Sequence, residues 1–115
     1  MQKLIILLIG SLFFYSCKKA TDSIANQTGN CGSIAYSYTA DIKPLLVTYC
    51  LTGSNCHSTG SLNSGGDLTD YDKVLNKKAA IRRNIELGIM PVNAVLSAEQ
   101  IKVFVCWIDS GAPNN

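Results

Sequence analysis

Apolar residues recur at helical spacing in several segments of this chain, and the first segment covers about residues 40–49. Its apolar side chains lie three or four positions apart: Ile42, Leu45, Leu46 and Tyr49. This spacing predicts a helix with one buried face. Thr39 or Asp41 is the candidate N-cap, and Pro44 is tolerated if it falls in the first turn. The helix would end just before Cys50.

A second helical region is predicted to begin near residue 67, with Thr69 or Asp70 as its N-cap. Its inward-facing side chains are expected to be Tyr71, Val74 and Leu75. After a break near Asn76, residues 77–87 are predicted to continue as a helix that Gly88 ends in the left-handed conformation. Three apolar side chains of this part are expected inside and four basic ones mainly outside: Ile81, Ile85 and Leu87, against Lys77, Lys78, Arg82 and Arg83.

The last helix has the strongest pattern. Ser97 and Gln100 fit a capping box, and Gly111 is placed to end the helix. Between them the apolar side chains follow at helical spacing: Ile101, Phe104, Val105 and Ile108. Because no segment alternates convincingly enough for a strand, the sequence predicts a small all-α domain of three to four helices.

Between these helices, residues 51–66 consist mostly of Ser, Thr, Asn and Gly, and after Leu51 at their start Leu62 is the lone large apolar residue. This is loop composition. A stretch of this length without regular structure is uncommon in a small domain unless it wraps a ligand or carries function. The loop therefore favours a bound cofactor.

The N-terminus has the pattern of an export signal. Residues 1–16 contain one basic residue and an apolar run that is too short for a spanning helix. The run closes on Ser16 and Cys17, which resembles a bacterial lipoprotein signal whose cysteine becomes the lipid-bearing N-terminus. An ordinary secretory signal with a chance cysteine is the alternative. Residues 17–30 would then form a lipidated flexible tether, and residues 31–115 the folded domain.

Removing the signal peptide takes away one basic residue and leaves nine basic and eight acidic residues. This balance gives no indication of a nucleic-acid partner. A domain of this size has a marginal apolar core, so disulfides, a metal or a cofactor are commonly needed for its stability.

The residues most suited to chemistry lie just before the polar loop and within it, namely Cys50, Cys56 and His57. Two thiols followed directly by an imidazole are what covalent attachment of haem requires, because the sulfurs add to the two vinyl groups and the histidine ligates iron. The usual motif has two residues between the cysteines, whereas this chain has five. Residues 53–55 can bulge outward, and a longer loop costs little more to close.

Met90 is the candidate second axial ligand. It is the only methionine left after signal removal, and Pro91 constrains the loop that holds it. Ligation by histidine and methionine raises the potential of a haem and suits electron transfer better than oxygen chemistry. The alternative is a plain core methionine, which is the commoner role of this residue.

Four cysteines remain if Cys17 carries lipid, in an oxidising compartment where free thiols rarely persist. They allow three disulfide connectivities. If haem takes Cys50 and Cys56, then Cys31 and Cys106 are left for one disulfide, which would join the start of the domain to its last helix.

Several short motifs resemble, in order and spacing, those of the small lipoprotein-anchored c-type cytochrome domains, which are similar to a compact class I cytochrome c. These motifs are ADIKPLL at 40–46, CLTGSNCH at 50–57, DL at 67–68 with Tyr71, GIMP at 88–91, LS at 96–97 and WIDSGAPNN at 107–115. The resemblance spans about residues 38–115. It implies one covalent haem c on Cys50 and Cys56, with His57 as proximal and Met90 as distal ligand of the iron.

The resemblance also implies an electron carrier or electron-entry domain that exchanges single electrons with redox partner proteins. The lipid on Cys17 would hold it in the cell envelope, facing the periplasm or the cell surface. The basic residues at 77, 78, 82 and 83 could dock an acidic redox partner or pair with haem propionates. A solvated helix face is the plainer interpretation of the same residues.

Two other interpretations remain. The first is a haem-free, disulfide-stapled lipoprotein that serves as an interaction module, with a Cys50–Cys56 bridge and His57 as an ordinary loop residue. The second is a zinc site on the same three residues. A tetrahedral zinc ion takes four ligands, and the adjacent Cys56 and His57 are poorly placed to bind the same ion. The sequence offers no acid–base pair, no nucleophile with its own base and no phosphate loop, so independent enzymatic activity is not expected.

Overall fold

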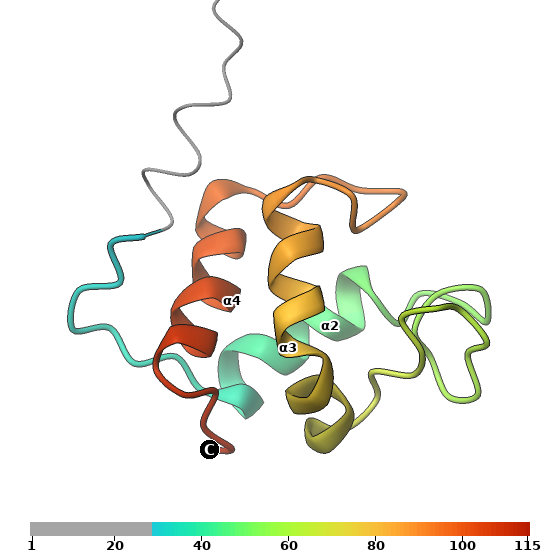
Figure 1. The fold of residues 1–115 in the computed structure, drawn as a ribbon, viewed down its shortest axis with the longest axis horizontal. Coiled ribbons are helices and arrows are strands. Elements are labelled where there is room, and N and C mark those ends of the chain that lie inside the picture. The colour runs from blue at the N-terminus through green and yellow to red at the C-terminus, as the bar shows by residue number, and fades with distance from the viewer. Residues whose placement is uncertain (1–28) are drawn as a thin grey trace, which may run out of the picture.

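The computed structural model describes residues 29–115, and this part of the chain is helical (Figure 1). Its elements are η1 (Tyr38–Ile42), α2 (Lys43–Tyr49), α3 (Tyr71–Glu86) and α4 (Ala98–Asp109). No strand occurs within 29–115, so the all-α prediction is confirmed. None of the helices in this range is long and apolar enough to cross a membrane. The predicted signal peptide, Cys17 and most of the predicted tether lie outside the described residues.

The first helical segment is a single π-helical turn, η1, that runs directly into α2. Ser37 caps it: its hydroxyl oxygen accepts a hydrogen bond from the Ala40 N–H at 3.1 Å, and the Asp41 carboxylate accepts one from the Ser37 N–H at 2.7 Å. The predicted N-cap at Thr39 or Asp41 was therefore wrong. The turn begins earlier than the apolar spacing indicates, because the buried Tyr38 already belongs to it.

Helix α3 is continuous, so the predicted break near Asn76 was wrong. The predicted cap at Asp70 is confirmed, because its carboxylate accepts a hydrogen bond from the backbone N–H three residues on, at 3.0 Å. The Asn76 side chain is exposed, and asparagine costs a helix interior only a fraction of a kcal/mol relative to alanine. Val74 and Ile85 are both buried in the core and hold the two halves of α3 to the same surface.

Helix α4 begins with the predicted capping box. The Ser97 hydroxyl oxygen accepts from the Gln100 N–H at 3.2 Å, and the Gln100 side-chain oxygen accepts from the Ser97 N–H at 2.8 Å. Gly111 follows the helix with φ +99°, a conformation that glycine adopts without steric cost. Five residues of α4 are buried: Ile101, Phe104, Val105, Cys106 and Trp107.

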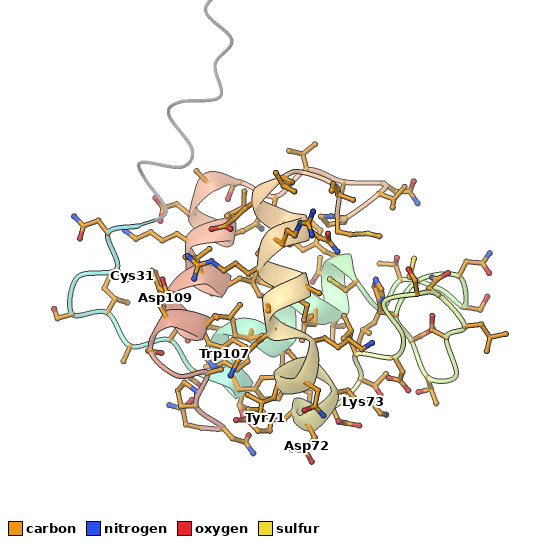
Figure 2. All side chains as sticks on the ribbon, in the orientation of Figure 1. Cys31, Tyr71, Asp72, Lys73, Trp107 and Asp109 are labelled. Atoms are coloured by element: carbon orange, nitrogen blue, oxygen red, sulfur yellow. A yellow bond between two sulfur atoms is a disulfide. The ribbon has the colours of Figure 1, made fainter. Side chains whose placement is uncertain are left out.

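Helices α3 and α4 lie side by side, and η1 packs against α4 (Figure 1). The core between them contains an aromatic group in which the Tyr38 ring meets Tyr71 edge-on at a centroid distance of 5.1 Å and lies 5.9 Å from Trp107. Figure 2 shows Tyr71 and Trp107 at the same end of the molecule. The C-terminal tail closes this end, because the Tyr71 hydroxyl donates to the Ala112 carbonyl at 2.8 Å and the Trp107 N–H to the Pro113 carbonyl at 3.0 Å.

Cys31 and Cys106 form a disulfide, with their Cα atoms 5.3 Å apart. It joins the segment before η1 to α4, beside which Cys31 lies in Figure 2. This is the pairing that remains when Cys50 and Cys56 are taken by haem. The same pairing remains when Cys50 and Cys56 bond to each other, so the disulfide is common to both interpretations.

Candidate functional site

A cavity of about 600 Å³ lies between the end of α2, the loop that follows it, one face of α3 and the loop after α3. Its size is within the roughly 300–1,000 Å³ of ligand and cofactor sites. All four predicted cofactor-binding residues line this one cavity: Cys50, Cys56, His57 and Met90. The structure thus brings together residues from two loops that are separated in sequence by the whole of α3.

The two ends of the cysteine motif are held together by the backbone. The Cys50 N–H donates to the Leu46 carbonyl at 2.8 Å, which makes Cys50 the C-cap of α2. The His57 N–H donates to the Cys50 carbonyl at 2.9 Å. A turn between them is closed by a hydrogen bond of 3.0 Å from the Cys56 N–H to the Gly53 carbonyl. The extra residues therefore form an outward turn, and Cys50 and His57 stay adjacent.

Side chains of the polar loop brace this turn. The Ser58 hydroxyl donates to the Gly53 carbonyl at 2.8 Å. The Asn63 amide donates to the Cys56 carbonyl at 2.9 Å and also to the Asn55 carbonyl, and the Ser61 hydroxyl donates to the Cys56 carbonyl. The composition of residues 51–66 predicts a loop but not these bracing roles. Ser and Asn clusters that bond the local backbone are the signal that could have indicated them.

His57 is half-buried, and its hydrogen bonds fix both its orientation and its tautomer. Its Nδ1 atom lies 2.7 Å from the Gly66 carbonyl oxygen. A carbonyl only accepts hydrogen bonds, so a neutral His57 carries its proton on Nδ1 and leaves Nε2 with a free lone pair. The His57 carbonyl in turn accepts from the Leu68 N–H at 2.9 Å. This is the arrangement in which an imidazole can ligate a metal through Nε2.

Gly65 lies directly against the His57 ring. A Cβ atom at Gly65 would be 3.1 Å from His57 Nδ1 and 2.4 Å from Cε1, and the shorter distance is closer than non-bonded carbon atoms approach. Any side chain at this position would therefore push the imidazole away from its present orientation. From the sequence, Gly65 is one of several glycines in the polar loop, and nothing in the pattern indicates its contact with His57.

The residue after the Gly66 carbonyl is anchored to the start of α3. The Asp67 carboxylate accepts from the Thr69 N–H at 2.8 Å and from the Thr69 hydroxyl at 2.5 Å, and Lys73 Nζ lies 3.1 Å from it. The bonds from Thr69, with the Lys73 ammonium as a smaller cause, lower the pKa of Asp67 to about 2. This network fixes the segment that presents the Gly66 carbonyl to His57.

Cys50 and Cys56 are free thiols, and both are partly buried at the cavity. Burial, followed by the charge of nearby Cys56, raises the pKa of Cys50 to about 11. Cys50 is therefore a neutral thiol at neutral pH. The Cys56 sulfur lies 3.5 Å from the Thr52 hydroxyl.

Met90 reaches the cavity from the loop after α3. Gly88, with φ +65°, ends the helix as predicted, and the N–H groups of Ile89 and Met90 donate to the Asn84 carbonyl at 2.9 and 3.2 Å. The Met90 side chain is half-buried and lines the cavity. Leu87, which was predicted inside, is 62% exposed, because it lies beyond the last buried turn of α3.

The four basic residues of α3 that were predicted to lie mainly outside have different surroundings. Lys77 lines the cavity, whereas Arg82 pairs with Glu86 at 3.3 Å and with Asp109 of α4. Lys78 is half-buried and Arg83 is exposed. None of the four is fully buried, and Lys77 alone among them borders the cavity, a distinction that the predicted outward placement of all four does not make.

Comparisons with protein-family models, with curated proteins and with solved structures gave no match for this chain. Among residues 29–115, no group of three or more His, Cys, Asp or Glu side chains is arranged to hold a metal ion. The zinc interpretation of the cysteine motif requires such a group. A haem requires only one or two axial ligands from the protein, because its porphyrin provides the other ligands of the iron.

Proposed function

We propose that this protein is a monohaem c-type cytochrome, a single-electron carrier with a cytochrome c-like fold. One haem c would be attached through Cys50 and Cys56, with His57 and Met90 as axial ligands. The observation that carries this proposal is that these four residues, from two separate loops, line a single cavity of about 600 Å³. When bound, haem supplies a one-electron couple between two oxidation states of its iron.

The state of His57 supports this assignment. The Gly66 carbonyl accepts a hydrogen bond from His57 Nδ1–H, so the lone pair of Nε2 is available for iron. Hydrogen bonding of the second nitrogen to a carbonyl is a usual feature of metal-ligating histidines, and it increases the basicity of the ligand. A histidine on an ordinary exposed loop has no need of a fixed tautomer.

The walls of the cavity also suit a porphyrin. Its apolar side is formed by Leu68, Ile81 and Ile85, and Met90 adds a thioether. Apolar surroundings and a methionine ligand favour a raised potential. With His57 and Met90 both bound to its iron, a haem would keep no coordination site for a substrate, which is why we propose electron transfer with redox partner proteins and no independent catalysis.

Expression with a c-type cytochrome maturation system tests the proposal. We expect a coloured protein whose haem survives denaturation and organic extraction, with one haem of added mass on the peptide that contains Cys50 and Cys56. The matched control is the double variant Cys50→Ser/Cys56→Ser, which should lose all covalent haem. A colourless protein with a Cys50–Cys56 disulfide would contradict the proposal and support the haem-free interaction module.

The axial ligand is tested separately with Met90→Ala. We expect a lower midpoint potential and loss of the sulfur-to-iron charge-transfer band, because a thioether ligand is removed. Ile89→Ala is the control, since its side chain is exposed on the same loop. An unchanged spectrum in Met90→Ala would exclude Met90 as a ligand.

We also propose that the protein is held in the cell envelope by lipid on Cys17. The support is the sequence pattern of residues 1–17. Cys17→Ser should move the full-length protein from the membrane fraction to the soluble fraction. Retention of the variant in the membrane fraction would contradict a lipid anchor at this residue.

A further inference from the structure

The wall of the cavity contains a single charged side chain, Lys77 of α3. The other titratable groups on the wall are Tyr49 and Cys50 at the end of α2, and Cys56 and His57 in the loop. The loop after α3 contributes no charged residue to the wall. In the proposed cytochrome both cysteines and His57 are engaged by haem, so Lys77 is the charged protein side chain that remains on the wall.

Lys77 lies on the same side of the cavity as the histidine clamp, which is the hydrogen bond between the His57 ring and the Gly66 carbonyl. A Cβ atom at Gly66 would be 3.8 Å from Lys77 Nζ, and it is the Gly66 carbonyl that accepts the bond from His57. The ammonium group is thus directed toward the segment that positions the imidazole.

Lys77 also differs from the two basic residues of α3 that form ion pairs with carboxylates. Lys73 bonds to Asp67 and Asp70, and Arg82 pairs with two carboxylates. Lys77 makes no ion pair with any side chain in residues 29–115. A half-buried lysine that lines a cavity and makes no ion pair with the described residues is suited to bind an anionic group of a ligand.

We propose that Lys77 binds a carboxylate of the group that fills the cavity, which for haem is one of its two propionates. This inference rests on the proposed function and adds a residue that orients the porphyrin by its acidic edge. The pair would be an ammonium–carboxylate hydrogen bond in a partly dry site, where such a bond is stronger than on the open surface.

The test uses the full-length haem protein and the variants Lys77→Gln, Lys77→Arg and Lys78→Gln, with the midpoint potential measured as a function of pH. A propionate that ionises favours the ferric state, so the potential falls as pH rises through the propionate pKa. Loss of the Lys77 charge should move this fall to higher pH by about 1 unit, because a neighbouring cation lowers a carboxyl pKa by that order. Lys77→Arg should retain the parental profile.

Lys78→Gln is the matched control, because it removes the same charge from the next residue of α3, which does not line the cavity. Its pH profile should match that of the parent. If all variants carry covalent haem and Lys77→Gln has the same profile as Lys78→Gln, Lys77 is not the carboxylate partner and the proposed cytochrome function stands. If the parent protein itself carries no covalent haem, the proposed function fails and the Lys77 inference fails with it.

Discussion

The aromatic end of the molecule, where Tyr38, Tyr71 and Trp107 meet, shields its apolar side chains from solvent. In the loop beside the cavity, by contrast, large apolar side chains are exposed to solvent. Tyr38, Tyr71 and Trp107 pack together, and Trp107 is only 1% exposed. In the loop after α3, Val92 lines the cavity and is 75% exposed, and Val95, which follows the lining residues, is 93% exposed. The first region is complete as it stands. The cavity region is held in shape by backbone hydrogen bonds, but part of its apolar wall is exposed to solvent. This is expected of a site that binds a ligand.

The two regions should therefore respond differently to substitution. Changes at the aromatic end should lower the free energy of unfolding with little effect on a bound haem in the protein that remains folded. Changes at the cavity should alter the properties of a bound haem and lower the free energy of unfolding less. The four predictions below separate the regions, from the largest expected effect to the smallest.

Trp107→Ala should destabilise the protein by about 3–5 kcal/mol, because it removes a large, fully buried side chain and the hydrogen bond to the Pro113 carbonyl. Denaturant unfolding monitored by circular dichroism measures the loss. Leu62→Ala is the control, since Leu62 is 100% exposed and its loss should change stability by less than about 0.5 kcal/mol. Equal effects of the two substitutions would show that the aromatic end is not the main source of stability.

The two cysteine pairs give a more direct comparison. Replacing Cys31 and Cys106 by Ser should cost roughly 2–4 kcal/mol, because their disulfide spans 75 residues and restricts the unfolded chain. Thermal unfolding of the protein expressed without haem maturation measures this. In the same preparation, replacing Cys50 and Cys56 by Ser should cost much less, because these thiols are free. A comparable cost for both pairs would indicate a second disulfide and favour the haem-free interpretation.

Gly65→Ala should disturb the site more than the fold. The new methyl group would overlap the His57 ring, and overpacking of this kind costs about 1–3 kcal/mol. In the haem protein we expect a shifted midpoint potential and an altered ligand-field spectrum, because the imidazole must tilt. Gly53→Ala is the control, since a Cβ atom there meets nothing within 4 Å. If both variants keep the parental spectrum, the close approach of Gly65 does not orient His57.

The difference between the regions also explains what the sequence could predict. Helix α4 follows from local chemistry alone: the capping box at Ser97 and Gln100, the apolar spacing and Gly111 all act within one helix. The exposed Asn76 and the early start at Tyr38 were misjudged because packing against distant residues decided both. Propensity is a weak guide where tertiary contacts prevail.

For the cavity, the sequence predicted the cofactor-binding residues but not the residues that hold them in position. Cys50, Cys56, His57 and Met90 were identified by chemical character and order, and they line one cavity. Gly65, Asn63 and the Gly66 carbonyl act through contacts that exist only after the loop has folded back on itself. The role of Lys77 likewise depends on which face of α3 borders the cavity, and helical spacing alone does not give that.

The smallest predicted effect is the pH-dependent contribution of Asp67 to stability. Asp67 anchors the segment whose Gly66 carbonyl bonds to His57. The folded pKa of Asp67, about 2, is below the unfolded value of about 3.9. The ionised carboxylate therefore stabilises the folded state above about pH 4, and this contribution is lost as pH falls toward 2. Asp67→Asn should be less stable than the parent at pH 7, and the difference should shrink over that interval.

Urea unfolding at a series of pH values measures this dependence. Asp72→Asn is the control, because Asp72 is exposed on the first turn of α3 and forms no ion pair with the described residues. A difference between Asp67→Asn and the parent that stays constant from pH 7 to pH 2 would show that the charge of Asp67 does not anchor the segment. If the difference shrinks and the His57 ligand field changes only in Asp67→Asn, the anchor at Asp67 acts on the cavity through the Gly66 carbonyl.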